Sequence, residues 1–423
     1  MTKMKESGID WIEQIPEEWE VRPIKNIIET PVTDGPHETP VLYETGIPFL
    51  SAEAVKDGIL DFNYKRGYIS LRDHERFKKK VSPKKDDIFI VKSGATTGNV
   101  GIVTTDEIFD IWSPLALIRS TKTLAIQKYI YFYLLSTIFK AQVEFNWSFG
   151  TQQNIGMGVI ERIKVILPPI SEQERIVEIL DKKTAQLDKV KALLEEQIQK
   201  LKDYRASLIY ETVTKGLDKN VPMKDSGIDW IGQVPEGWEI SKIRYLVTTR
   251  SEKRITDSSI PYIGLENIES QTGKFVETGI QVDKSENIVV EIGDVLFGKL
   301  RPYLRKYWRA TFPSTASSEF LVFQSSELDM NFLYYAIQSD SFIEEVNTST
   351  YGSKMPRASW EYIKNMKIAF PSSLVEQQKI ADFLDKKTIQ IDKLIQIKNQ
   401  QIDNINKQRQ TLIYDYVTGK RRV

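Results

Sequence analysis

The chain has 423 residues, no cysteine, two histidines, and 58 basic against 58 acidic side chains, so its formal net charge is zero. This length suggests two or three domains, and the lack of cysteine excludes disulfides, thiolate metal sites and cysteine nucleophiles. Zero net charge argues against a uniformly basic protein that binds DNA without regard to sequence, although local basic patches remain possible.

The N-terminal segment shows no targeting signal. Met1–Glu6 lacks the apolar core of a signal peptide. The longest apolar run, near Tyr129–Phe139, is shorter than the roughly 20 residues that a membrane span requires. We therefore expect a cytoplasmic protein that does not cross a membrane.

The element that opens the chain occurs twice. Met4–Ile27 and Met223–Leu246 are identical at more than half of their positions, and both contain Ser-Gly-Ile-Asp-Trp-Ile. A second matched pair, Ser171–Gly216 and Val375–Gly419, follows the two divergent middle regions. We interpret the similar ends as contacts with the same partner made twice, and the divergent middles as contacts with two different targets.

The repeated opening element carries four tryptophans. We expect them to pack in the core where each domain meets a helix, and contact with a partner is the alternative. They are Trp11, Trp19, Trp230 and Trp238.

Each middle region reads as a mixed domain. Short β-branched runs separated by glycine and proline predict strands, and one amphipathic stretch in each region predicts a helix. The strands are expected over Asp87–Lys92, Val100–Thr104, Ile163–Leu167 and Asp294–Phe297, and the helices over Ala125–Val143 and Asn331–Val346.

A long helix is predicted after each middle region. Apolar residues recur every seven positions, which is typical of a coiled coil. The first seam is Leu180, Leu187, Leu194, Leu201 and Leu208, supported by Ile176, Val190 and Ile198; the second is Leu384, Ile391, Lys398, Ile405 and Leu412, supported by Ile380, Leu394 and Ile402. Each helix of about 40 residues spans about 60 Å. We expect the two helices to pair with each other, and separate packing of each helix on its own domain is the alternative.

The ends of these helices also have local signals. Ser171 and Glu174 have the spacing of a capping box, after Pro168-Pro169. Gly216 and Gly419 stand where helices commonly end.

These elements predict a mixed α+β fold. Two similar α/β domains are separated by two long antiparallel coiled-coil helices in a circular, pseudo-two-fold arrangement, with the two termini close together. The segments are expected at 1–29, 30–167, 168–248, 249–371 and 372–423.

The repeated motifs resemble a known family. SGIDWI followed by proline and tryptophan, EQ..I…LD at each helix start and LIY..V.G at each helix end are similar to the specificity subunit of Type I restriction–modification systems. The resemblance covers essentially the whole chain. It implies two target recognition domains, each reading one half of a bipartite, interrupted double-stranded DNA target, with the helices as a spacer.

The same resemblance implies partners that carry the chemistry. Two methylation subunits would supply S-adenosylmethionine, and two restriction subunits would supply ATP- and Mg-dependent activity. This chain itself is expected to have no catalytic residue, metal or cofactor. The sequence has no GxxxxGK[ST] loop, and Leu167-Pro168-Pro169-Ile170 lacks the polar and aromatic ends of a methyltransferase tetrad. A structural coiled-coil adaptor and a stand-alone DNA-modifying enzyme are the alternatives.

Two loops in each half are candidates for DNA contact. Loop 1a is Lys92–Asn99, loop 1b is Trp147–Asn154, loop 2a is Lys299–Arg309 and loop 2b is Tyr351–Arg357. Loop 2a holds five cations and no acid. Arginine binds guanine bidentately, asparagine and glutamine bind adenine, and hydroxyls and backbone N–H groups bind phosphates.

The candidate DNA-contacting residues follow from this chemistry. In the first half they are Lys92, Ser93, Gly94, Thr96, Thr97, Thr151, Gln152, Gln153 and Asn154, with His37 from a loop near the domain start. In the second half they are Lys299, Arg301, Tyr303, Arg305, Lys306, Tyr351, Gly352, Ser353, Lys354 and Arg357, while Trp308 is expected in the core. The alternatives are a solvated basic loop for 2a, a simple β-turn for 1a, polar packing loops for 1b and 2b, and a surface turn with an incidental histidine at His37.

Overall fold

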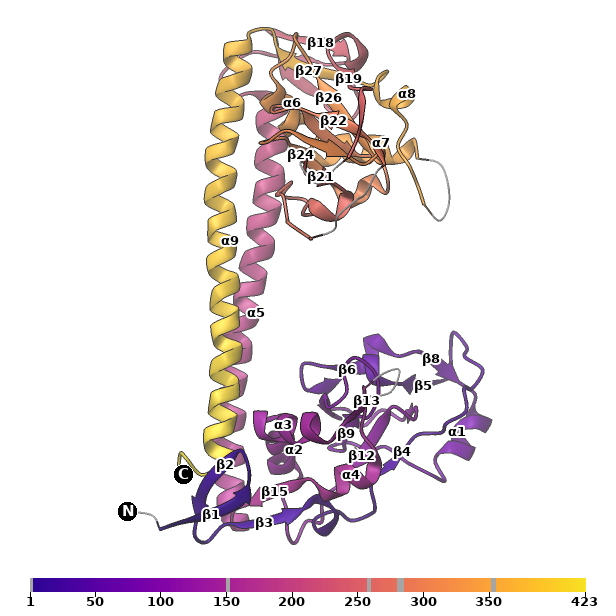
Figure 1. Ribbon diagram of the computed structural model, residues 1–423, viewed down its shortest axis with the longest axis vertical. Helices are drawn as coiled ribbons and strands as arrows, with labels where there is room; N and C mark the ends of the chain where they lie inside the picture. Colours follow the sequence, from indigo (N-terminus) through magenta and orange to yellow (C-terminus); the bar gives the residue numbers. More distant parts are fainter. Residues whose placement is uncertain (1–2, 150–152, 257–259, 280–284, 351–354) are drawn as a thin grey trace. The chain divides into compact units, whose positions relative to one another are not determined.

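The computed structural model describes residues 3–149, 153–256, 260–279, 285–350 and 355–423. These residues form two units. Unit 1 comprises Met1–Leu194 and Gln400–Val423, and unit 2 comprises Glu195–Asn399. Two long helices, α5 (Ile170–Lys215) and α9 (Leu374–Val417), each continue from one unit into the other (Figure 1). The predicted mixed α/β fold with two long helices is therefore confirmed.

The domain of unit 1 is built around strand β9 (Ile88–Val91), which is buried on both faces. Ile88 and Ile90 point into the same core as the helices, whereas Phe89 and Val91 belong to a second apolar cluster. This alternation follows from the two-residue period of a strand. The strand order is β4-β12-β9-β10-β7-β6 in one described sheet and β11-β5-β8 in another.

The remaining elements of unit 1 surround these sheets. Its strands are β1 (Met4–Ile9), β2 (Ile12–Pro16), β3 (Glu20–Pro23), β4 (Thr33–Asp34), β5 (Ile47–Leu50), β6 (Val55–Lys56), β7 (Ile59–Leu60), β8 (Gly67–Ile69), β9 (Ile88–Val91), β10 (Val100–Ile102), β11 (Asp110–Ile111), β12 (Leu115–Ile118), β13 (Ser148–Phe149), β14 (Gln153–Asn154) and β15 (Lys164–Leu167). Its short helices are α1 (Leu71–Phe77), α2 (Gln127–Leu135), α3 (Thr137–Asn146) and α4 (Met157–Arg162), with 3-10 turns η1 (Ile24–Asn26), η2 (Ala52–Ala54) and η3 (Phe62–Tyr64).

Unit 2 repeats this plan with a narrower first sheet and a different second sheet. Its described sheets have the orders β19-β26-β23-β24 and β20-β22-β25-β21. The strands are β16 (Met223–Asp225), β17 (Gln233–Pro235), β18 (Trp238–Lys242), β19 (Thr248–Thr249), β20 (Lys253–Ile255), β21 (Tyr262–Ile263), β22 (Glu286–Val290), β23 (Val295–Gly298), β24 (Tyr307–Arg309), β25 (Ser314–Ala316), β26 (Phe320–Gln324) and β27 (Lys367–Pro371). The short helices are α6 (Met330–Ala336), α7 (Asp340–Thr348) and α8 (Trp360–Ile363), with turns η4 (Ile243–Tyr245), η5 (Leu265–Asn267) and η6 (Pro302–Leu304).

The predicted single helix in each domain is wrong, because each is split in two. Ser136 ends α2 and begins α3, and Ser339 stands between α6 and α7. Each serine hydroxyl accepts a bond from the backbone N–H three residues later, which satisfies a donor that a helix start leaves without a partner. The chain therefore turns at a residue that the apolar pattern passes over.

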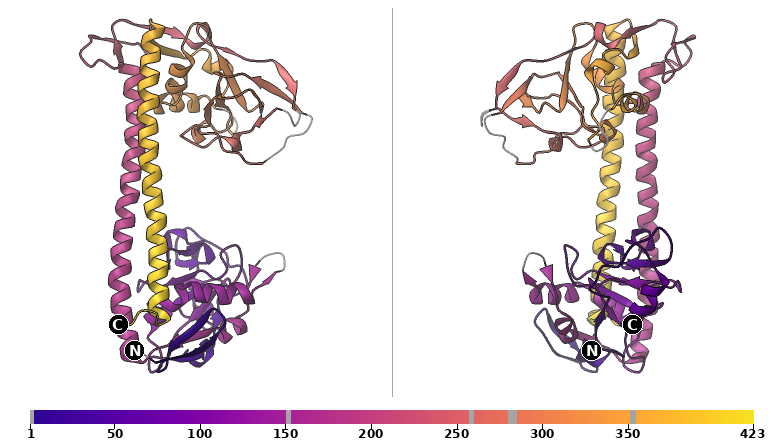
Figure 2. Two further views of the ribbon diagram at one scale, coloured as in Figure 1. Left: turned by 60° about the vertical axis from the view of Figure 1, so that its left-hand side comes forward. Right: turned by 90° about the vertical axis from the view of Figure 1, so that its right-hand side faces the viewer.

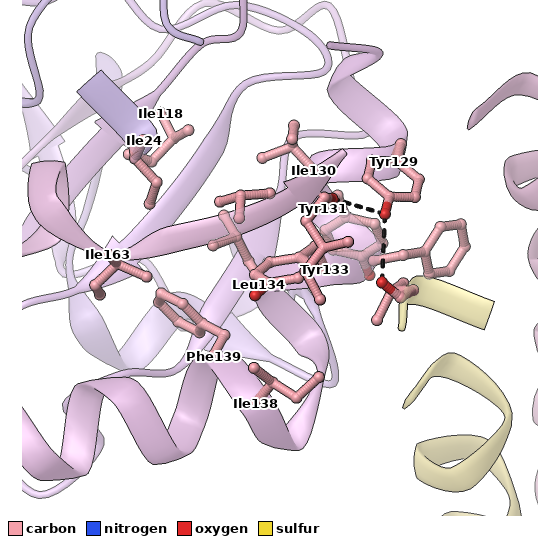
Figure 3. Packing of buried hydrophobic residues seen from close by; sticks show 14 of the residues in the cluster. Ile24, Ile118, Tyr129, Ile130, Tyr131, Tyr133, Leu134, Ile138, Phe139 and Ile163 are labelled. Carbon is pink, nitrogen blue, oxygen red and sulfur yellow. Dashed lines mark hydrogen bonds between the residues drawn. The ribbon is translucent and has the colours of Figure 1, made fainter. Parts of the chain in front are cut away.

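Helix α2 carries several of the largest fully buried side chains of unit 1. Tyr129 and Tyr133 are fully buried among isoleucines and Phe139, as Figure 3 shows. The Tyr129 hydroxyl donates to the Ile166 carbonyl at 2.9 Å, and the Val417 carbonyl of α9 lies at 3.5 Å (Figure 3). The domain core therefore extends to both long helices.

Each domain meets the start of a long helix through the same contact, a hydrogen bond from a tryptophan to a glutamate. The Trp19 indole N–H donates to Glu172 at 2.9 Å in unit 1, and that of Trp238 donates to Glu376 at 3.2 Å in unit 2. Both indoles are buried, as predicted. Trp11 differs from the prediction: its ring is 41% exposed and packs edge-on against the Phe145 ring.

The long helices pair within each unit and also pack on the domains. In unit 1 Arg409 of α9 lies 3.5 Å from Asp188 of α5, and in unit 2 Arg205 of α5 lies 3.6 Å from Asp392 of α9. Lys398 occupies its seam position by donating a hydrogen bond to Gln197 on the facing helix. Pairing of the two helices with each other and packing of each helix on a domain, which were alternatives from the sequence, are thus both present.

Three local predictions about these helices have different outcomes. Val190 and Leu394 are 46% and 47% exposed, so they lie outside the seam. Helix α5 begins at Ile170, and the Glu172 N–H donates to the Pro169 carbonyl, so the predicted capping box at Ser171 is wrong. The predicted C-terminal glycines are confirmed, because Gly216 and Gly419 have φ values of +73° and +75°.

The two ends of the chain meet in unit 1. Arg422 pairs with Glu18 at 2.6 Å and with Glu172 at 3.0 Å. Figure 2 shows the C-terminal residues just beyond the final turn of α9, next to the strands near the start of the chain. Among the described residues, no helix combines the length and the hydropathy that a membrane span needs.

Candidate nucleic-acid interface

The two candidate loops of unit 1 form one surface. Loop 1a follows β9, and loop 1b contains the paired antiparallel strands β13 and β14 about fifty residues later. The Gly94 N–H donates to the Gln153 carbonyl at 3.0 Å, and the Ile155 N–H donates to the Lys92 carbonyl at 2.8 Å. Backbone pairing therefore brings together two segments that the sequence predicts separately.

Unit 2 brings its two loops together in the same way. The Arg301 N–H donates to the Pro356 carbonyl at 2.7 Å, and the Ala358 N–H donates to the Lys299 carbonyl at 2.9 Å. Loop 2a follows β23, the strand that matches β9. The same backbone framework therefore supports both candidate surfaces, although their side chains differ.

Lys92 lies in an internal ion pair of unit 1. Its ammonium group and that of Lys80 both bind Asp34, whose side chain is fully buried. Burial alone would raise the pKa of the Asp34 carboxyl, but the hydrogen bonds and charges of the two lysines lower it below its ordinary value of 3.8. His37 lies 3.2 Å from the same carboxylate and is 71% exposed at its side chain. Lys92 therefore supports the loop from within, and His37 is presented at its surface.

The small residues of loop 1a divide between support and exposure. The Thr97 hydroxyl is buried and donates to the Gly94 carbonyl at 2.8 Å, with the Gln153 carbonyl at 3.2 Å. Ser93 is half-buried, whereas Thr96 and Asn154 are exposed. The exposed groups offer hydroxyl, amide and backbone donors, which are the groups that contact phosphates and base edges.

Loop 2a has an unusual backbone between its arginines. Arg301 and Arg305 have φ values of +51° and +54° and flank the η6 turn. Non-glycine residues rarely adopt this conformation, and such positions are concentrated at functional sites. The turn presents Tyr303, which is 52% exposed, while Trp308 is buried in the core as predicted.

Two of the loop 2a cations contact distant parts of their own unit. Arg305 forms an ion pair with Asp340 of α7, and Lys306 donates to the Ile268 carbonyl. Lys299 is half-buried, and that burial lowers the pKa of its ammonium group, while Glu319 opposes the shift. The basic run in the sequence is therefore partly neutralised in the fold.

Glu319 is a residue that the sequence prediction missed. Its carboxylate binds the Arg357 guanidinium through Nη2 at 2.9 Å and Nε at 3.1 Å. Its backbone carbonyl accepts the Lys299 N–H at 2.7 Å. The acid precedes β26, and only the pairing of β26 with β23 brings it to the loops. In the sequence, the only feature that marks Glu319 is its position directly before the apolar run that forms β26.

Six of the predicted contacts lie outside the described residues. They are Thr151, Gln152, Tyr351, Gly352, Ser353 and Lys354.

Comparison with known proteins gives a consistent result. The family model for the Type I restriction modification DNA specificity domain matches residues 16–202 and 235–407. The MjaVIII specificity subunit of Methanocaldococcus jannaschii is 24% identical, over 97% of this chain and 94% of its own length. The EcoDI specificity subunit of Escherichia coli is also 24% identical, over 63% of this chain and 64% of its own length.

A solved structure from a study of complex assembly and conformational transition of the type I R-M system has the same fold. Its TM-score is 0.67 at 14% identity, covering 96% of this chain and 99% of that chain. The family model alone matches most of this chain, once in each half. The chain belongs to the family of Type I restriction–modification DNA specificity subunits.

Proposed function

We propose that each unit reads one half of a bipartite, interrupted DNA target, and that this chain is the sequence-reading, non-catalytic subunit of its complex. The observation that carries the proposal is the shared loop framework. Loops 1a with 1b and loops 2a with 2b are joined by matching backbone hydrogen bonds, yet their side chains differ. One framework with two chemistries is what reading two different half-sites requires.

The charges on the two surfaces support direct contact with DNA. The unit 2 surface carries Lys299, Arg301 and Arg357, and the Glu319 carboxylate binds the Arg357 guanidinium. The unit 1 surface is mainly polar, with amide and hydroxyl groups. We infer that local contacts supply specificity, and that partner subunits supply much of the sequence-independent attraction to phosphates.

We infer that two methylation subunits dock on repeated surfaces of the long helices. Val190 and Leu193 on α5 are exposed, and so are the matching Leu394 and Ile397 on α9. Exposed apolar residues that recur at matched positions fit one partner bound twice. Two restriction subunits complete the proposed complex. S-adenosylmethionine, ATP and Mg are then held by those partners, the helices set the gap between half-sites, and the assembly works in the cytoplasm.

The proposal is tested on the chain purified with its methylation subunit. Sequences that the complex selects from a randomised duplex library should share two short conserved base blocks, separated by a spacer of constant length and variable sequence. An adaptor without DNA readout predicts no fixed blocks, and replacing Arg301 and Arg357 by alanine would then leave DNA binding unchanged. A stand-alone modifying enzyme predicts methyl transfer or cleavage by this chain without partners.

A further inference from the structure

Asn154 and Arg357 occupy the same place in their two units. Asn154 forms a β-bridge with Ser93 of loop 1a, and Arg357 forms one with Leu300 of loop 2a. The flanking hydrogen bonds also match, because the carbonyl of the residue before each accepts an N–H from loop 1a or loop 2a, and the N–H of the residue after each donates to the carbonyl of the first lysine of that loop. The two side chains therefore leave the backbone at equivalent points.

The two side chains are the ones that distinguish purines. Asparagine pairs bidentately with adenine through N6 and N7, and arginine pairs bidentately with guanine through O6 and N7. Asn154 is exposed, and the Arg357 side chain is 36% exposed. At this shared position unit 1 therefore carries a side chain suited to adenine, and unit 2 carries one suited to guanine.

The residue that supports the position differs as well. In unit 2 the Lys299 N–H donates to the Glu319 carbonyl, and in unit 1 the Lys92 N–H donates to the Pro114 carbonyl, both at 2.7 Å. Glu319 and Pro114 are thus equivalent. The carboxylate is therefore present in unit 2, where the shared position is an arginine, and is replaced by proline in unit 1, where it is an asparagine. The Glu319 carboxylate binds the edge of the Arg357 guanidinium formed by Nε and Nη2. A fixed guanidinium plane lowers the entropy lost on bidentate pairing.

We propose that the position shared by Asn154 and Arg357 determines base specificity in each half-site, with Arg357 reading guanine, Asn154 reading adenine, and Glu319 acting as the positioning residue for Arg357. This inference rests on the proposed DNA-reading function and adds the residues and bases to it.

The test is selection of bound sequences from a randomised duplex library by the complex of this chain with its methylation subunit. Arg357→Lys keeps the charge and removes the planar fork, and Glu319→Gln keeps the size and removes the charge. Lys79→Ala, at an exposed lysine of unit 1 outside the loops, is the control. The double variant Asn154→Arg with Pro114→Glu transfers the unit 2 pair into unit 1.

We expect Arg357→Lys to reduce the preference for guanine at one position of the second half-site by about fivefold or more, with the first half-site unchanged. Glu319→Gln should weaken the same position to a smaller extent, and Glu319→Asp should restore part of it. The unit 1 double variant should gain a guanine in the first half-site. The control should select the wild-type motif.

Two results would overturn the inference. One is an unchanged motif with Arg357→Lys, and the other is a uniform loss of affinity for all sequences, which is the behaviour of a phosphate contact. If a unit 2 variant loses both half-sites because it fails to fold, the unit 1 double variant decides, since its second half-site is intact. A wild-type complex that selects no bipartite motif refutes the proposed function instead.

Discussion

The glycines that end the two long helices allow a matched prediction about stability. Gly216 and Gly419 both have left-handed backbones, with φ of +73° and +75°. Alanine in that conformation costs about 1–2 kcal/mol relative to glycine. Gly216→Ala and Gly419→Ala should therefore lose the same amount through the backbone alone.

The surroundings of the two glycines differ. A Cβ on Gly419 would lie 2.6 Å from Cδ of Pro16 and 3.2 Å from the Trp19 ring, whereas one on Gly216 would lie no closer than 3.4 Å to the Trp238 ring. The first is a steric overlap and the second is an ordinary contact. Overpacking adds about 1–3 kcal/mol, so we expect a total loss of about 2–5 kcal/mol for Gly419→Ala and about 1–2 kcal/mol for Gly216→Ala.

Native-state hydrogen exchange measures the two losses separately, which matters because a chain of two units need not unfold in one step. Peptides covering β2 and β3 report on Gly419, and peptides covering β17 and β18 report on Gly216. Exchange should accelerate more around β2 and β3 in Gly419→Ala than around β17 and β18 in Gly216→Ala. Equal acceleration, or a larger effect of the Gly216 variant, would refute the steric argument.

Three further outcomes follow from the described contacts. Asp87→Ala removes the buried carboxylate that binds the Arg119 guanidinium at 2.6 and 2.7 Å. The variant should lower the free energy of unfolding by about 3 kcal/mol in urea titrations, because it leaves an unpaired charge in the fold. A loss under about 1 kcal/mol would contradict a buried ion pair. Asp34→Asn should make stability depend less on pH in the acid range, because the lowered pKa of this carboxyl stabilises the fold at pH values above 3.8, its ordinary pKa. That contribution is lost as the pH falls through the lower pKa of the folded state. A melting temperature that falls with acid equally in the variant and the wild type would show that the two lysines do not stabilise the charge. Val190→Lys combined with Leu394→Lys should leave thermal unfolding unchanged and weaken binding of the methylation subunit by about tenfold or more in a titration, because both positions would act as interface anchors. Unchanged binding would place the docking surface elsewhere.

The architecture is largely readable from the sequence. The repeat, the heptads and the glycines at Gly216 and Gly419 depend on residues close together in the chain, so their patterns predict the two long helices and the strands β9, β10 and β23. The apolar pattern does not predict where a helix is interrupted by one serine whose hydroxyl caps the next helix. Ser136 ends α2 and begins α3, and Ser339 begins α7 shortly after α6 has ended, although the apolar period continues through both serines.

The candidate surfaces are harder to predict because they depend on distant partners. Composition marks Lys92 and Arg305 as DNA contacts, but the fold supplies each with an acid, Asp34 and Asp340 respectively. No local pattern shows which acid a β-sheet will bring to which cation. The joining of loops 1a and 1b likewise depends on strand pairing across about fifty residues, which only the folded chain reveals.

The two units differ in how synthesis can complete them. Unit 2 is one continuous stretch, Glu195–Asn399, whereas unit 1 needs Gln400–Val423 to join residues made much earlier. Until that segment emerges from the ribosome, Ile176, Leu180 and the Trp19 ring lack the apolar partners that Ile413 and Val417 provide. Exposed apolar surface of this kind favours aggregation and binding by chaperones. The contacts within unit 2 therefore need no residue made after Asn399, whereas those of unit 1 are complete only when the last turns of α9 are made.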